Sequence, residues 1–114
     1  MILIHSTSRK AKLRLVAFVR TQTDEAIVIA PTPKEIVPLA RKHRPRQIFI
    51  YLPDRILMAL TVHAFMRVRY PRLPVCLLPA VPGTKQLGDD WQSVVAKTLR
   101  CRTANGHIKK AAQP

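Results

Sequence analysis

The chain has 114 residues, of which 47% are hydrophobic and 5% aromatic. This length suits one domain with one core, and the apolar content excludes a disordered chain. Twenty lysines and arginines against six acids give a net charge of +14, which favours contact with a polyanion, although a basic surface that serves only solubility is the alternative.

The first half of the chain alternates predicted strands and helices. Residues 2–4 form an apolar run typical of a buried strand. Apolar residues then recur at helical spacing over residues 9–21, with five bases among them. Residues 26–30 are mostly β-branched, as in a strand buried on both faces. The prolines at 31 and 33 end this strand and begin a second helix, which ends before Pro45.

The second half repeats the alternation. Residues 47–52 predict a third strand, and residues 75–78 predict a fourth. Between them, residues 55–70 contain neither glycine nor proline and are largely apolar, so this helix has apolar side chains on more than one face. Deep burial and a protein interface both explain that pattern. After a loop, a last helix keeps apolar spacing from Trp91 to Leu99.

Strands that alternate with helices predict an α/β fold with three layers and a parallel sheet of four or five strands. We expect one domain over residues 1–102 and a basic, disordered tail over residues 103–114.

Two stretches of the sequence resemble a known family. They run from Arg44 to Leu52 and from Tyr70 to Ala80, and the opening apolar strand adds to them. Together they resemble the receiver domains of bacterial response regulators over about residues 1–80. The resemblance implies a flavodoxin-like fold.

The functional positions of that family carry other residues here. The acidic pair that would hold Mg²⁺ falls on Ser6 and Thr7. The phosphorylated aspartate falls on Tyr51, and the threonine that contacts the phosphoryl group falls on Pro79. Mg²⁺ prefers carboxylate oxygens, and a phenol with an ordinary pKa of about 10 does not replace a carboxylate nucleophile. The resemblance therefore implies a pseudo-receiver that is not an enzyme and holds neither a metal nor a cofactor.

The resemblance stops after the fourth predicted strand. Only about ten residues separate Leu78 from the last helix, too few for the family's fourth helix and fifth strand. The fourth strand then forms an exposed sheet edge, which invites pairing with another chain. We expect a protein partner or a second copy to bind at this edge or at the third helix. The candidate interface residues are Ile56, Leu57, Leu60, Phe65, Trp91 and Val95.

The basic residues are spread over several predicted elements. No helix-turn-helix or zinc-finger spacing accompanies them, so nucleic acid, if bound, would be contacted mainly through its phosphates. The candidate polyanion-binding residues are Arg9, Lys10, Lys12, Arg14, Arg41, Lys42, Arg44, Arg46, Arg67, Arg69, Arg72, Arg100 and Arg102.

Two functional hypotheses follow. The first is a non-catalytic pseudo-receiver that binds proteins in bacterial signalling or gene control, and the alternative is a basic accessory protein that binds nucleic acid non-specifically. No apolar run is long enough to span a bilayer, so we expect a cytoplasmic protein without a membrane partner, with Cys76 and Cys101 reduced. Residues 1–23 hold five bases and no acid, which also suits an organellar transit peptide, but the opening run fits a strand better.

Overall fold

The computed structural model describes residues 1–81, 84 and 86–100, and a four-stranded parallel sheet forms its centre. The strands are β1 (Ile2–Ser6), β2 (Ile27–Ile29), β3 (Gln47–Tyr51) and β4 (Val75–Leu77). Their order is β2-β1-β3-β4, which is the flavodoxin-like order without its fifth strand. The predicted α/β fold with a parallel sheet is confirmed.

The two central strands are the most apolar segments of the chain. All five residues of β3 are buried, as are the first four of β1, whereas β2 and β4 at the rims are half-buried. Leu3 stands in register with Val28 on one side and Ile48 on the other. A strand with helices on both faces needs apolar side chains at successive positions, which explains the unbroken apolar runs.

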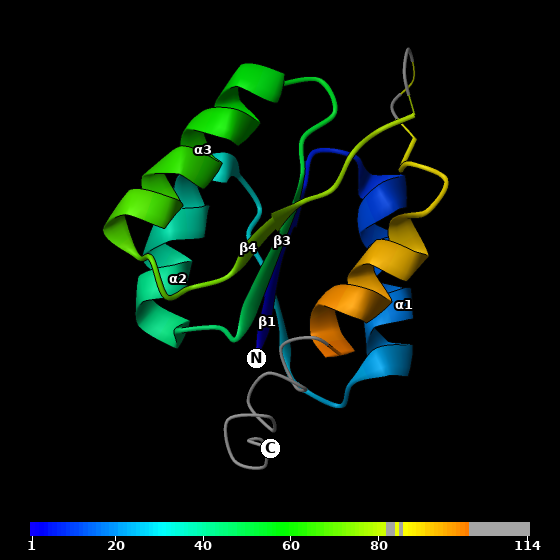
Figure 1. The fold of residues 1–114 in the computed structure, drawn as a ribbon, viewed down its shortest axis with the longest axis horizontal. Helices are drawn as coiled ribbons and strands as arrows, with labels where there is room; N and C mark the ends of the chain where they lie inside the picture. Colours follow the sequence, from blue (N-terminus) through cyan, green and yellow to red (C-terminus); the bar gives the residue numbers. More distant parts are fainter. Residues whose placement is uncertain (82–83, 85, 101–114) are drawn as a thin grey trace, which may run out of the picture.

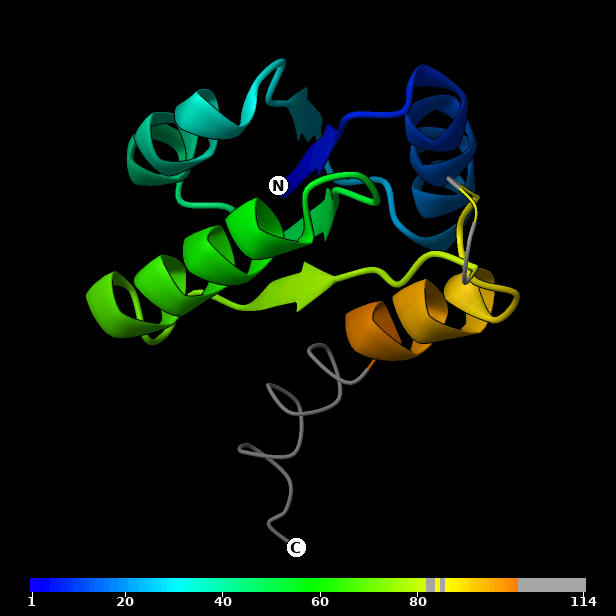
Figure 2. The ribbon, with the colours of Figure 1, turned by 90° about the horizontal axis from the view of Figure 1, so that it is seen from above.

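Helices cover both faces of the sheet. They are α1 (Arg9–Gln22), α2 (Ile36–His43), α3 (Ile56–Arg69) and a last helix over residues 91–100. A short 3₁₀ turn, Pro33–Glu35, leads into α2. Figure 1 and Figure 2 show α2 and α3 on one face of the sheet, and α1 with the last helix, drawn in orange, on the other.

Each face has its own core. On the α1 face, Ile4 and Phe49 of the sheet pack with Leu15. On the α2 and α3 face, Ile48 packs among residues that include Met66. The strict alternation of strand side chains between the two faces produces this division.

The prediction that Trp91 and Val95 form an interface is wrong. Trp91 is 4% exposed and Val95 is 0% exposed, and both belong to the core on the α1 face. The Trp91 ring meets Phe18 of α1 edge-on, with ring centroids 5.3 Å apart and an interplanar angle of 72°. Because α1 shares this face of the sheet with the last helix, the apolar stripe of the last helix is needed as core.

The segment after β4 turns back on itself. Ala80 forms an antiparallel bridge with Leu87, and the Gly88 N–H donates to the Pro79 carbonyl at 2.8 Å. A Cβ on Gly88 would lie 3.2 Å from that carbonyl oxygen, so the tight approach suits glycine. Within the described ranges, no fifth strand follows β4.

Cys101, Arg102 and the predicted tail over residues 103–114 lie outside the described residues. Among the helices that are described, none is both long enough and apolar enough to cross a membrane.

Candidate functional site

The hydroxyl groups at the carboxyl end of β1 serve local structure. Ser6 Oγ donates to the Ser8 carbonyl at 2.8 Å and accepts from the Ser8 N–H at 3.0 Å. Ser8 Oγ in turn accepts from the Ala11 N–H and caps α1. Thr7 is exposed, and its N–H donates to the Tyr51 carbonyl at 3.2 Å. Ser6 and Thr7 therefore shape the turn into α1, and neither supplies a carboxylate for a cation.

Tyr51 and Pro79 occupy the other two positions that the receiver resemblance singles out. The Tyr51 side chain is fully buried in the core on the α1 face, and burial raises the pKa of its phenol. A buried neutral phenol is a poor nucleophile toward a phosphoryl donor. Pro79 is exposed, and its carbonyl already accepts from Gly88.

His5 is buried next to these positions. It extends β1 beyond the apolar run, is 1% exposed, and has Nδ1 2.7 Å from the Ala30 carbonyl oxygen. Burial lowers the pKa of the imidazole, which favours the neutral ring, and Nδ1 then carries the proton because a carbonyl only accepts. His5 lines an open hollow of about 570 Å³ with Lys34 and Arg55. In the sequence, only the alternation of side chains along the strand hints at the burial of His5.

The outward side of α3 is apolar and exposed. Only Ala59 and Met66 of this helix are buried. Leu57 is 81% exposed, Leu60 is 53% exposed and Val68 is 84% exposed. At 3.6 residues per turn, these three side chains project away from the side that holds Ala59 and Met66.

The remaining large apolar side chains of α3 extend this surface. Ile56, Met58 and Phe65 are exposed as well. Four of the six predicted interface residues thus lie on the surface of one helix, namely Ile56, Leu57, Leu60 and Phe65. We call these four residues and Val68 the α3 face.

An apolar groove adjoins the α3 face. It lies between α3 and the chain that follows β4, and it encloses about 450 Å³. Its lining includes Leu52, Ile56, Leu60, Leu77, Pro79 and Val81. Flavodoxin-like folds place a further helix and strand after β4, and the described part of this chain places none over the groove.

The outer edge of β4 is also open. Ile48 N–H donates to the Pro74 carbonyl, and Leu78 N–H donates to the Ile50 carbonyl, so these positions face β3. Backbone groups alternate sides along a strand, so Val75 and Leu77 direct their N–H and carbonyl groups outward. The bridge between Ala80 and Leu87 lies beyond this stretch, and no described strand other than β3 pairs with it.

The predicted basic residues divide into different environments. Arg9, Lys10 and Arg14 are exposed on α1, whereas Lys12 is half-buried there. The Arg14 guanidinium lies 5.5 Å from the centroid of the Trp91 ring. Arg46 differs from them, because its Nε donates to the Glu25 carboxylate at 2.6 Å. Its charge is therefore neutralised within the fold.

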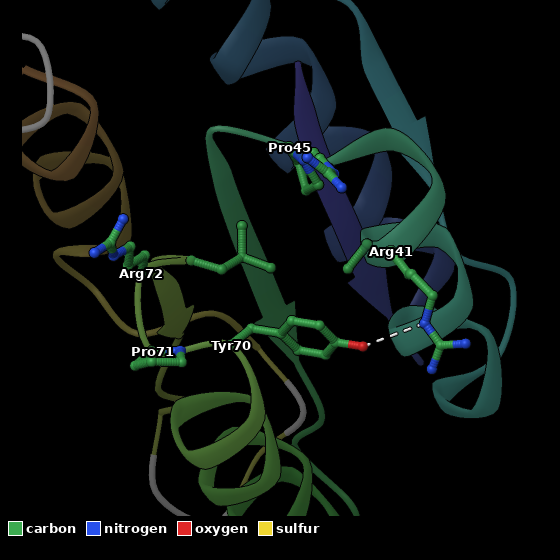
Figure 3. Close-up of a pocket in the computed structure, with 8 residues that line it drawn as sticks. Arg41, Pro45, Tyr70, Pro71 and Arg72 are labelled. Atoms are coloured by element: carbon green, nitrogen blue, oxygen red, sulfur yellow. Dashed lines mark hydrogen bonds between the residues drawn. The ribbon is translucent and has the colours of Figure 1, made fainter.

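Three of the predicted basic residues come together around Tyr70. Arg41 and Arg44 lie at the end of α2, and Arg72 lies in the turn before β4. With Tyr70 they line an open hollow of about 530 Å³, and Arg41 Nε donates to the Tyr70 hydroxyl at 3.3 Å (Figure 3). The sequence could not reveal this grouping, because the residues come from separate elements.

No group of three His, Cys, Asp or Glu side chains capable of holding a metal occurs among the described residues. Cys76 is a free thiol, and burial raises its pKa.

Comparisons of the chain with protein-family models, with curated proteins and with solved structures find no match.

Proposed function

We propose that this protein is a non-catalytic, cytoplasmic, receiver-like module that regulates bacterial signalling or gene control by binding a protein partner. The observation that carries the proposal is the α3 face, which stands open beside the apolar groove. Exposed contiguous apolar surface of this kind marks contact sites, because covering it removes unfavourable hydration.

The charge around the α3 face favours an acidic partner. Arg67 and Arg69 are exposed on the last turn of α3 and flank the apolar side chains, and Arg55 precedes its first turn. A second copy of a chain with net charge +14 would bring like charges together. We therefore infer that the partner is a helix with an apolar stripe bordered by Asp and Glu. A homodimer through the α3 face or the β4 edge is the competing outcome.

A synthetic helical peptide with a leucine stripe and flanking glutamates tests this partner chemistry. We expect micromolar binding by the protein, and we expect the double variant Leu57→Glu, Leu60→Glu to bind at least about tenfold more weakly, because it places carboxylates in the contact. Isothermal titration calorimetry measures both affinities.

Leu13→Glu is the matched control, because Leu13 is 57% exposed on α1, across the sheet from α3. It should bind the peptide as the unmodified protein does. Equal binding by the double variant would refute the proposed interface. If sedimentation analysis shows that the unmodified protein is a dimer and that the double variant is a monomer, the partner is a second copy of the chain.

The absence of catalysis is proposed from the same fold. Ser6 and Thr7 offer hydroxyls where a receiver has its acidic pair, and Tyr51 is buried. Incubation with acetyl phosphate and Mg²⁺ should leave the intact mass unchanged, because no carboxylate stands at the acceptor position. A receiver domain that retains its aspartate serves as the positive control. A phosphoryl group added to this protein and lost in Tyr51→Phe would contradict the proposal.

Binding to nucleic acid is the second candidate, and the net charge of +14 favours it. Binding to duplex DNA or RNA through phosphates alone weakens steeply with salt. A fluorescence titration in low and moderate salt separates the two candidates. Micromolar duplex binding that collapses with salt and is unchanged in the double α3 variant would favour nucleic acid as the partner.

A further inference from the structure

The hollow around Tyr70 shares no lining residue with the α3 face or with the groove. It is formed where α2 and α3 end, at the end of the sheet opposite Ser6 and Tyr51 (Figure 1). Figure 3 shows the Tyr70 hydroxyl pointing to Arg41, with Arg72 on the opposite rim. None of these residues is assigned a role by the proposed function.

The rim of this hollow carries three guanidinium groups and no carboxylate. Arg41, Arg44 and Arg72 are all exposed. The two ion pairs within the described ranges both involve Glu25, and neither uses one of these arginines. Guanidinium groups suit phosphate because their N–H donors match two of its oxygens at once.

Arg44 holds its place at a conformational cost. It has φ 47° and ψ 61°, it is the one described non-glycine residue with positive φ, and its N–H donates to the Ala40 carbonyl at 2.9 Å. This is the helix-ending position at which glycine is favoured, because a Cβ is crowded there. The exposed side chain of Arg44 gains no core packing in return. Such strain is a recurrent property of binding sites.

The floor of the hollow is apolar and partly aromatic. Tyr70 is half-buried, and Pro45, Pro71 and Leu73 lie around it. Arg69 lies 5.6 Å from the centroid of the Tyr70 ring. The volume of about 530 Å³ falls within the range of small-molecule sites. A ligand that fits needs a flat apolar body and a phosphate group.

We propose that this hollow binds a small phosphorylated ligand of the size and chemistry of a nucleoside monophosphate. The phosphate is held by Arg41 and Arg44, which lie together at the end of α2, and the base lies against Tyr70 and the neighbouring prolines. Arg41 is positioned by its hydrogen bond to the Tyr70 hydroxyl.

Isothermal titration calorimetry with adenosine monophosphate at low salt tests the site. We expect Arg44→Gly to weaken binding at least about tenfold, which is the effect of losing one charge-assisted contact. The same variant should melt at an equal or higher temperature than the unmodified protein, because glycine suits φ 47°. Loss of binding therefore does not arise from unfolding.

Arg20→Ala is the matched control. It removes one exposed positive charge from α1 on the other face of the sheet and should change the affinity less than about twofold. Adenosine without its phosphate should bind at least about tenfold more weakly than the monophosphate. The double α3 variant should keep its nucleotide affinity, which separates this site from the proposed protein interface.

Three results would each overturn the assignment. They are an Arg44→Gly affinity equal to that of the unmodified protein, an equal loss in Arg20→Ala and Arg44→Gly, and adenosine binding as tight as that of the monophosphate. A single-stranded oligonucleotide that binds through Arg44 far more tightly than the mononucleotide would assign the hollow to nucleic acid instead.

Discussion

At the scale of single residues, Glu25 is the acid that forms both ion pairs found among the described residues. Its carboxylate accepts from the Met1 amino group at 2.7 Å and from Arg46 Nε at 2.6 Å. It thereby joins the starts of β1 and β3 to the segment that leads into β2. The hydrogen bond from Arg46 is the largest cause that lowers the pKa of Glu25 from 4.5 to about 2.

This lowered pKa predicts an acid-sensitive contribution to stability. The contribution is complete above about pH 4.5 and is lost as the pH falls toward 2, because the unfolded chain binds the proton first. Glu25→Gln should lower the free energy of unfolding at pH 7 by about 1 to 2 kcal/mol, allowing for partial solvent screening, and should flatten its decline between pH 4.5 and 2.5.

Urea unfolding at several pH values measures both effects. Asp24→Asn changes the neighbouring exposed acid and should alter the free energy of unfolding by less than about 0.5 kcal/mol. An unchanged acid dependence in Glu25→Gln would show that another group governs it.

At the scale of helices and strands, the composition of each element explains which predictions from the sequence succeeded. Four apolar runs predicted four strands because each strand has an apolar centre, and helical spacing located the helices between them. The structure extends β1 to Ser6 and shortens β2 and β4, because pairing sets strand ends and apolar composition does not.

The same periodicity did not tell which helix faces solvent. Trp91 and Val95 repeat at the spacing expected of any apolar helix face, and only the sheet order reveals that α1 and the last helix share one face. The grouping of Arg44 and Arg72 was hidden for a related reason, since two different loops bring them together. Periodicity reports that a face is apolar but does not report what it contacts.

A matched pair of substitutions tests the two helix environments. Val95 is 0% exposed in the last helix, and Val68 is 84% exposed on α3. Val95→Ala should lower the free energy of unfolding by about 2 kcal/mol, because it leaves a cavity. Val68→Ala should change it by less than about 0.5 kcal/mol, because alanine is the better helix former and little buried area is lost. Urea unfolding measures both.

Similar losses in the two variants would mean that the α3 face is covered in solution. That result would support self-association and contradict an open surface awaiting another protein.

At the scale of the whole molecule, the dominant electrostatic feature is the net charge of +14. The chain carries twenty basic residues and only six acids, so its basic side chains repel one another on balance. The folded chain has a radius of gyration of 14.1 Å. The repulsion is long-ranged at low ionic strength and acts on the folded state more than on the expanded chain, where the charges lie farther apart.

Sodium chloride should therefore stabilise the protein. Raising its concentration from about 10 mM to about 100 mM shortens the screening length from about 30 Å to about 10 Å, and the melting temperature should rise. Calorimetry measures the shift, and a chloride salt avoids anions such as sulfate that guanidinium groups bind tightly. A melting temperature that falls with salt would show that attractive pairs such as Arg46 with Glu25 outweigh the repulsion.

The prolines around β4 bear on whether this sheet edge can template aggregation. Pro74 and Pro79 bracket a strand of only three residues, and proline offers no N–H to an incoming chain. Fibril growth requires six or seven consecutive residues of roughly uniform β-structure, and this rim supplies about half of that length. The open edge therefore admits one short foreign segment and resists templated aggregation.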